Sequence, residues 1–440
     1  MRFAIGVSQE RALSMRGTVS MFRFILCICL WGMARLVGAE PLTFDGALQI
    51  ATRSSPDIAQ QTANVEAEAA RSLAAGRLPD PKLAFGVEDL PVTGPNQWSL
   101  TRDDFTMRTI GLMQDFPNGA KRAAQTAAAS AAVATAEAQR RVSMLSVRRD
   151  TAVAWLDRFY LERRSGLFDD LERENRLFAE AVQAQFAAGR GMAADVVEPK
   201  QEAAEIADLR DELIAEILKS KAVLTRWVGA AANEPLGGEP PVLALEAEHL
   251  RGHVHEHPDL AVFVPMTQMA QAEVHEAEAA KRPDWGVELS YGRRGPAFSD
   301  MVSLQFTVDL PLFGKTRQDP KIQAKRHELA RVESERDAML REHTQELEAD
   351  LAEYDVTTRQ LTRSREVHLP LARQKVDYQF ASYRAGKGDL TAVLAARREL
   401  IDARLKEIEL DRKRAEAAAK LYYFYGLGAS EGSANSEGAR

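Results

Sequence analysis

Histidines are the residues of this chain whose type and spacing most directly suggest metal chemistry. Half of its eight histidines fall close together, at His249, His253, His255 and His257. Neutral imidazole suits Zn²⁺ and copper ions, so His253, His255 and His257 are candidate metal ligands. The alternative is a solvated linker, because His257 directly precedes Pro258, and proline is typical of the first turn of a helix. We favour the linker and treat metal binding as the weaker hypothesis.

Carboxylates beside two glycine-containing turns form the second candidate site. The turns are Ala188–Gly191 and Ala385–Gly388, and the nearby acids are Asp195, Glu198 and Asp389. In an assembly with rotational symmetry, each acid facing the axis would recur as a ring that raises its own pKa and attracts cations. The alternative is helix capping, for which aspartate is preferred. We favour capping for Asp389.

Enzymatic motifs are absent or lack the required context. The run Gly189-Arg-Gly-Met-Ala-Ala194 fits a dinucleotide-binding pattern, but it follows a predicted helix, whereas such a site needs a preceding strand. The sequence contains no nucleophile–base constellation, HExxH helix or phosphate loop. We therefore expect no enzymatic activity and no cofactor.

The first 39 residues are expected to be a secretory signal peptide. Arg16 and Arg23 precede an apolar run at 24–31, and small residues follow at 37–39. The apolar run is short for a spanning helix, which makes a retained anchor the weaker alternative. Secretion through this leader would place the rest of the chain outside the cytoplasm.

Cysteine and charge content exclude several function classes. Cys27 and Cys29 both lie in the expected leader, so the remaining chain has no disulfide, no cysteine-ligated metal and no cysteine for a lipid anchor. The net charge of −7 becomes −11 without the leader, and no basic run remains, which disfavours nucleic acid as a partner. No later stretch approaches the ~20 apolar residues of a membrane helix, so any membrane crossing would use strands.

A proline-free stretch at 119–188 must position the first glycine turn. It is rich in alanine, glutamate and arginine, which are strong helix formers, and its single internal glycine is Gly166. As one helix it would be about 100 Å long. Its apolar positions step by four, seven and four residues at Leu167, Leu171, Phe178 and Val182. This length and spacing indicate a coiled coil.

The chain also repeats itself, which predicts an internally duplicated protomer. The matching pairs are Ser55-Pro56-Asp57 with His257-Pro258-Asp259, Asp115-Phe116-Pro117 with Asp309-Leu310-Pro311, and the two Ala-Gly-x-Gly turns. The first repeat is expected at 40–229, with strands at about 82–88 and 105–116, a long helix at 119–188 and a return helix at 193–228. A linker at 230–244 precedes the second repeat at 245–428, with strands at about 285–291 and 302–311, a long helix at 319–384 kinked at Pro370, a return helix at 390–425 and then a disordered tail at 429–440.

The expected strands alternate between apolar and polar residues. At 302–308, for example, Val, Leu, Phe and Val alternate with Ser, Gln and Thr. Alternation over such lengths is typical of membrane-barrel strands with an apolar face toward lipid, although a small soluble sheet would also fit. Because four strands cannot close a barrel, the chain would have to pool strands with other copies of itself, and three copies would give twelve.

At this point the residues resemble a known family. The duplicated plan, the paired turns and the run Leu78-Pro-Asp-Pro-Lys through Gly86-Val-Glu-Asp-Leu-Pro-Val-Thr-Gly94 resemble the TolC family of outer-membrane efflux channels. The segment from Leu100 to Pro117 resembles the branch associated with heavy-metal efflux, of the CzcC and CusC kind. The likeness extends over about Pro41–Gly428.

The resemblance implies a mainly α fold with a small β part, assembled as a homotrimer. Long coiled-coil helices would form a periplasmic α-barrel, and four strands per protomer would build a 12-stranded β-barrel in outer-membrane lipid. It also implies a periplasmic adaptor (membrane fusion protein) and an inner-membrane pump of the resistance–nodulation–division (RND) type. The adaptor would meet the turn residues Gly189, Arg190, Gly191, Gly386, Lys387 and Gly388.

The resemblance places the channel closure near the same turns. The family often carries acids just after the second turn, where this chain has Ala392 and Ala395, so Asp195, Glu198 and Asp389 are the constriction candidates. The expected cargo is a heavy-metal cation, copper and silver or cobalt, zinc and cadmium. Drug efflux, type I secretion and a periplasmic coiled-coil adaptor that spans no membrane stay open as alternatives.

Overall fold

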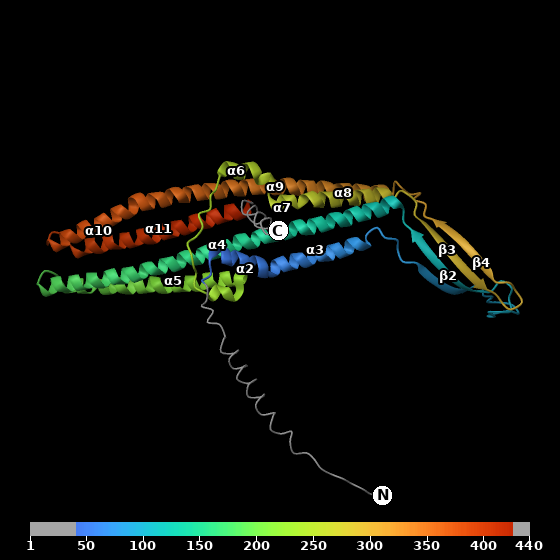
Figure 1. The fold of residues 1–440 in the computed structure, drawn as a ribbon, viewed down its shortest axis with the longest axis horizontal. Coiled ribbons are helices and arrows are strands. Elements are labelled where there is room, and N and C mark those ends of the chain that lie inside the picture. Colours follow the sequence, from blue (N-terminus) through green and yellow to red (C-terminus); the bar gives the residue numbers. More distant parts are fainter. Residues whose placement is uncertain (1–40, 426–440) are drawn as a thin grey trace, which may run out of the picture.

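The computed structural model describes residues 41–425, and the expected leader at 1–39 and tail at 429–440 lie outside them. The molecule is elongated, with the sheet at one end and the ends of two helical hairpins at the other (Figure 1). No helix within 41–425 combines the length and the apolar character that a bilayer span requires.

The helices of the first half follow local start signals. They are α2 (Phe44–Ser54), α3 (Pro56–Ala74), α4 (Gly119–Ala187) and α5 (Glu198–Val228). The Ser55 hydroxyl accepts from the Ile58 amide at 3.4 Å, and the Asn118 side chain accepts from the Lys121 amide at 2.9 Å. Such caps satisfy amides that have no partner within the helix, so α3 and α4 begin directly after these residues.

The second half is more broken than the sequence predicts. Its helices are α6 (Ala247–His253), α7 (Pro258–Ala261), α8 (Phe263–Ala279), α9 (Gln318–Arg363), α10 (Leu369–Arg384) and α11 (Leu390–Phe424). Short 3₁₀ turns at Ala193–Val196, Gly229–Asn233 and Val254–Glu256 connect helices. In the first half, the 3₁₀ turn at Ala193–Val196 precedes the return helix, so α5 starts at Glu198 and not at the expected residue 193.

A π-helical segment replaces the expected simple kink in the second long helix. Residues Ser364–His368 form it, and Leu369 donates its amide to the Ser364 carbonyl, five residues back. Pro370 follows immediately and has no amide to donate. The wider π-helical turn lets backbone carbonyls before Pro370 find other amide donors. The helix therefore bends at this point and continues as α10.

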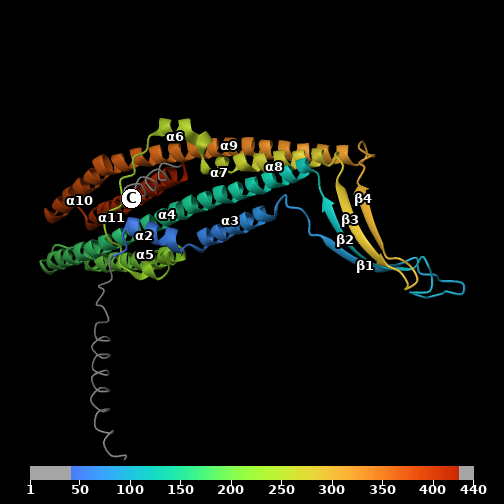
Figure 2. The ribbon, with the colours of Figure 1, turned by 45° about the vertical axis from the view of Figure 1, so that its right-hand side comes forward.

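The strands form one antiparallel sheet in the order β1-β2-β3-β4. Their bounds are β1 (Lys82–Glu88), β2 (Met107–Phe116), β3 (Trp285–Arg293) and β4 (Met301–Val308). Each half contributes one hairpin, and β2 pairs with β3 across the two halves. The sheet extends beyond the helices (Figure 2).

The main core lies mid-molecule, where α2, α4, α5 and α11 meet. Trp155 on α4 is fully buried, stacks on Phe159 and donates its indole N–H to the Leu42 carbonyl at 3.0 Å. Tyr423 and Phe44 pack in the same core. Toward the sheet, α4 buries alanines where it packs on α3 and α8, because small side chains allow long helices to approach closely.

Candidate functional site

The four-stranded sheet has an exposed apolar face and a polar face that is exposed on the two outer strands and partly buried on the two central ones. Cross-strand rows on the first face are Leu83–Leu112–Leu289–Leu304 and Phe85–Ile110–Tyr291–Val302. Rows on the opposite face are Ala84–Gly111–Ser290–Ser303 and Lys82–Met113–Glu288–Gln305. The apolar side chains are not covered, since Phe85 is 82% exposed and Leu304 59%. An apolar surface of this kind marks contact with lipid or protein.

The two glycine turns share one backbone geometry at the far end from the sheet (Figure 1). Gly189 has φ of 72° and Gly386 of 71°, a left-handed conformation that glycine adopts without strain. In each turn the amide after the glycine bonds back to a carbonyl five residues earlier, at 3.0 Å. This bond ends α4 and α10 in the manner of a Schellman motif, so the predicted turn residues lie at the tips of two helical hairpins.

One of the three predicted constriction acids caps its own helix, and a second accepts a bond within a short 3₁₀ turn. The Asp389 carboxylate accepts from the Ala392 amide at 3.0 Å, as the capping interpretation expects. This bond, with others from Thr391, holds the pKa of Asp389 below its ordinary value. Asp195 accepts from the Met192 amide at 2.9 Å. Glu198 is exposed in the first turn of α5, and no local bond of this kind occupies it in the described chain.

Glu198 opens onto an acidic groove between α5 and α11. The groove has a volume of about 620 Å³, and its charged lining consists of Glu198, Glu202, Glu205, Asp208, Arg398 and Asp402. The three acids that follow Glu198 on α5 come at steps of four, three and three residues, which places them on one helix face. That spacing is the signal by which the sequence could have revealed them.

A mostly buried ion pair joins the first hairpin to the second beside this groove. Arg397 of α11 lies 3.3 Å from Glu202 of α5, with side chains only 13% and 14% exposed. The Arg397 guanidinium also lies 4.6 Å from the ring centre of Phe178 on α4. Burial raises the pKa of Glu202, and the charge of Arg397 offsets this rise only in part. The tips are therefore joined within one protomer.

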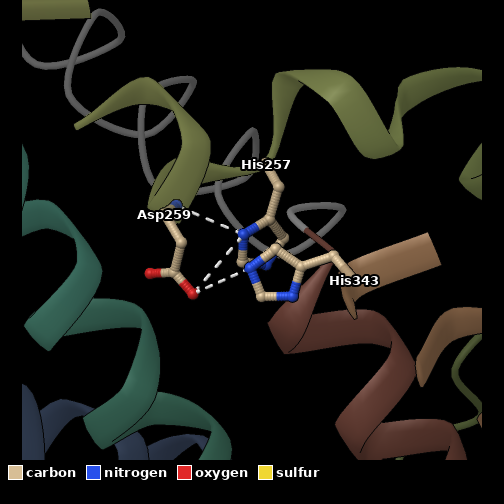
Figure 3. A group of neighbouring side chains, drawn as sticks. All are labelled: His257, Asp259 and His343. Atoms are coloured by element: carbon tan, nitrogen blue, oxygen red, sulfur yellow. Dashed lines mark hydrogen bonds and ion pairs between the residues drawn. The ribbon is translucent and has the colours of Figure 1, made fainter. Parts of the chain in front are cut away.

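The histidine cluster does not form a solvated linker throughout. His253 and His255 are exposed, but His257 is only 4% exposed, which corrects the linker prediction for that residue. Its ring packs against His343 (Figure 3). It also packs against Phe424 and Tyr425. These contacts come from helices far along the chain, so local sequence gave no sign of them.

The aromatic run at the end of α11 packs inside the molecule. Tyr423 and Tyr425 are both buried, Tyr423 beside Phe44 and Tyr425 in a cluster with Leu250. These two rings therefore belong to the helical core of the molecule.

The chain is similar to a known protein family and to several solved structures. Residues 254–427 match the family described as outer membrane efflux protein. No curated protein matches the chain. Among solved structures, the outer membrane protein VceC of Vibrio cholerae is 18% identical, with a TM-score of 0.72, covering 87% of this chain and 96% of VceC. A membrane protein of Pseudomonas aeruginosa is 15% identical, with a TM-score of 0.75, covering 87% and 90%. CusC is 14% identical, with a TM-score of 0.73, covering 88% and 92%.

The chain has a TolC-like fold. The predicted class, mainly helical with a small antiparallel sheet, is confirmed. The family match falls on α7 to α11 and the last two strands, so sequence likeness is concentrated in the second half. The TM-scores to the three structures are nearly equal, and fold alone does not favour the heavy-metal branch.

Proposed function

We propose that three copies of this chain form an outer-membrane channel that carries solutes from the periplasm to the exterior. The observation that carries the proposal is the sheet, which has an exposed apolar face and a polar face on its opposite side. Membrane-barrel strands have this alternation because one face meets lipid and the other meets water. The TolC-like fold and the efflux-family match support the same function.

Symmetry explains how so few strands could cross a membrane. In the described residues β1 and β4 are edge strands, each paired on one side only. Unpaired strand edges are not tolerated in lipid, so each edge must pair with another copy. Three copies would supply twelve strands, with Leu83, Leu304 and their neighbours facing lipid and the Ser290 and Gln305 face lining the lumen.

The helical end would then meet a periplasmic adaptor and a pump of the RND type. Gly189–Gly191 and Gly386–Gly388 are at the tips, where a partner can reach both hairpins at once. Asp195, Glu198 and Asp389 lie close behind the tips and would form the constriction as threefold carboxylate rings. Capping by Asp389 does not conflict with this role, since the charge of a capping carboxylate persists.

The cargo is proposed to be a heavy-metal cation, copper and silver or cobalt, zinc and cadmium. Support comes from the segment Leu100–Pro117, which resembles the heavy-metal branch, and from the acidic groove next to the tips, which suits cations. Expression with a matching pump and adaptor in an efflux-deficient host tests this. Raised tolerance to metal salts is expected, and raised tolerance to drugs alone would overturn the cargo assignment.

The channel itself is tested by single-channel recording in planar bilayers together with mass measurement in detergent. A trimer with discrete, cation-selective openings is the expected result. A monomer that stays in solution without detergent and conducts nothing would contradict the proposal. The alternative of a periplasmic coiled-coil adaptor would then replace it.

A further inference from the structure

Three side chains with metal-binding atoms converge where α7, α9 and α11 meet (Figure 3). The atoms are His257 Nδ1, Asp259 Oδ2 and His343 Nε2, all within 4.8 Å of one another. Asp259 Oδ2 lies 3.3 Å from His343 Nε2 and 3.7 Å from His257 Nδ1. Ligands about 2.0–2.1 Å from a tetrahedral Zn²⁺ are separated by roughly 3.4 Å, so the spacing fits one shared ion.

Burial distinguishes this group from ordinary surface histidines. The side chains of His257 and His343 are 3% and 5% exposed. Neither ring nitrogen of His343 has a hydrogen-bond partner in the structure. The nearest acceptors are carboxylate oxygens, Asp259 Oδ2 at 3.3 Å from Nε2 and a Glu346 oxygen at 3.4 Å from Nδ1. Because buried polar atoms nearly always have partners, Nε2 is a buried nitrogen that an ion shared with Asp259 would satisfy.

The outer nitrogens of both rings face acceptors, as metal-bound histidines require. His257 Nε2 lies 2.6 Å from the Phe424 carbonyl, so this nitrogen carries the proton and Nδ1 carries the lone pair. On His343, the outer Nδ1 lies 3.4 Å from a Glu346 carboxylate oxygen. Carbonyl or carboxylate contacts of this kind fix the tautomer and orientation of metal-ligating imidazoles.

We propose that His257, Asp259 and His343 bind one divalent transition-metal ion of the Zn²⁺ class, with water as the fourth ligand. Two imidazoles and one carboxylate suit Zn²⁺ better than Ca²⁺ or Mg²⁺, which prefer oxygen ligands. The ion displaces one weak contact, the 3.2 Å bond from the Asp259 amide to His257 Nδ1. This inference is independent of the proposed cargo.

The position of the ion indicates a structural role. His257 and Asp259 stand at the start of α7, His343 is on α9, and the Phe424 carbonyl belongs to the last turn of α11. One ion would therefore clamp the beginning and end of the second repeat. Because such a site exists only in the folded chain, binding adds directly to stability.

A metal-free account competes with this proposal. If His343 is protonated, it can pair with Asp259 and Glu346 without any ion. The two accounts differ in metal content, in spectroscopy and in the response to Glu346→Gln. Only the metal account predicts stoichiometric Zn²⁺.

The test uses the untagged full chain in detergent, stripped with a chelator and then titrated with Zn²⁺ or Co²⁺. One Zn²⁺ per chain after gel filtration, a tetrahedral Co²⁺ absorption spectrum and a rise in melting temperature on adding Zn²⁺ are expected. His343→Gln and Asp259→Asn should weaken Zn²⁺ binding at least tenfold. Glu346→Gln keeps all three ligands and should weaken Zn²⁺ binding by about 10–100-fold. This variant still tests the proposal if a ligand variant does not fold.

Matched controls come from the exposed histidines nearby. His253→Gln and His255→Gln should leave the Zn²⁺ stoichiometry and the Co²⁺ spectrum unchanged, because neither ring faces the site. The proposal is overturned if the wild-type chain retains no stoichiometric Zn²⁺. It is equally overturned if folded His343→Gln binds as well as the wild type, or if binding is lost only in His253→Gln or His255→Gln.

Discussion

Asn118 and Asp284 join the two halves of the molecule at the boundary between the helices and the sheet. The Asp284 carboxylate accepts from the Asn118 backbone amide at 2.7 Å and from its side-chain amide at 2.8 Å. The other carboxylate oxygen lies 3.3 Å from the Lys121 ammonium. Asn118 also caps α4, so one contact fixes both the start of the longest helix and the approach to β3.

Replacing Asp284 by asparagine should lower the free energy of unfolding by about 2 kcal/mol at neutral pH, since it removes charge-assisted hydrogen bonds. Burial opposes ionisation of Asp284, but the bonds from Asn118 and the charge of Lys121 outweigh it, so its pKa is lowered. The carboxylate therefore stabilises the fold above the ordinary aspartate pKa, and this contribution is lost as the pH falls below about 4. Thermal unfolding of wild type and variant across this range measures the effect.

The control for Asp284 is Asp319→Asn. Asp319 pairs with Lys281 at the same end of the helices, but this pair is about half exposed. Exposed pairs contribute little, so the change in melting temperature should be small. An equal loss in both variants would contradict the special role of the Asn118 contact.

Arg397→Met should destabilise the chain by about 3 kcal/mol, because it leaves Glu202 buried without a counter-charge. The pKa of Glu202 is already raised by burial and would rise further. A raised pKa means that Glu202 takes up a proton more readily in the folded state. The stability lost in Arg397→Met should therefore become smaller as the pH falls toward 5 and larger at higher pH. Unfolding at pH 5 and pH 8 measures this.

Arg398→Met is the matched control for Arg397. Arg398 pairs with Glu205, and these side chains are 71% and 56% exposed. Little change is expected. The double change Arg397→Met with Glu202→Gln should recover part of the stability, and a failure to recover any would show that packing on Phe178, not charge, governs this position.

Leu304→Arg should impair membrane assembly, whereas Gln305→Arg should be tolerated. The two residues are neighbours on β4 but belong to opposite faces of the sheet. An arginine facing lipid near the bilayer midplane costs about 2–4 kcal/mol, while a lumen-facing one is hydrated. The fraction of each variant recovered as a detergent-extracted trimer measures this. Equal recovery of both variants would contradict the assignment of the apolar face to lipid.

Neutralising the acids behind the tips should reduce cation selectivity. Asp389→Asn is the sharpest variant, because asparagine caps a helix as well as aspartate does and only the charge is lost. Reversal potentials in a salt gradient should shift toward zero for Asp389→Asn and for Glu198→Gln. Asp402→Asn, deeper along the groove, serves as the comparison. If Asp389→Asn changes neither the cation selectivity nor the stability, Asp389 is a helix cap and has no role in the constriction.

Local patterns in the sequence were sufficient for the longest helix and for the first strand. The proline-free stretch after Asn118 gives a helix from Gly119 to Ala187, and alternation at 82–88 gives a strand with those bounds. Each depends on neighbouring residues only, through caps, turns and side-chain periodicity. The mainly helical class and the capping role of Asp389 were predictable for the same reason.

Only the tertiary structure decided which distant residues meet. His257 looked like part of a linker, yet it is buried against His343 and Phe424, residues that lie 86 and 167 positions further along the chain. The pair of Arg397 with Glu202 spans 195 positions. Contacts of this kind depend on how long helices pack side by side, and periodicity shows that a face is apolar without showing which partner covers it.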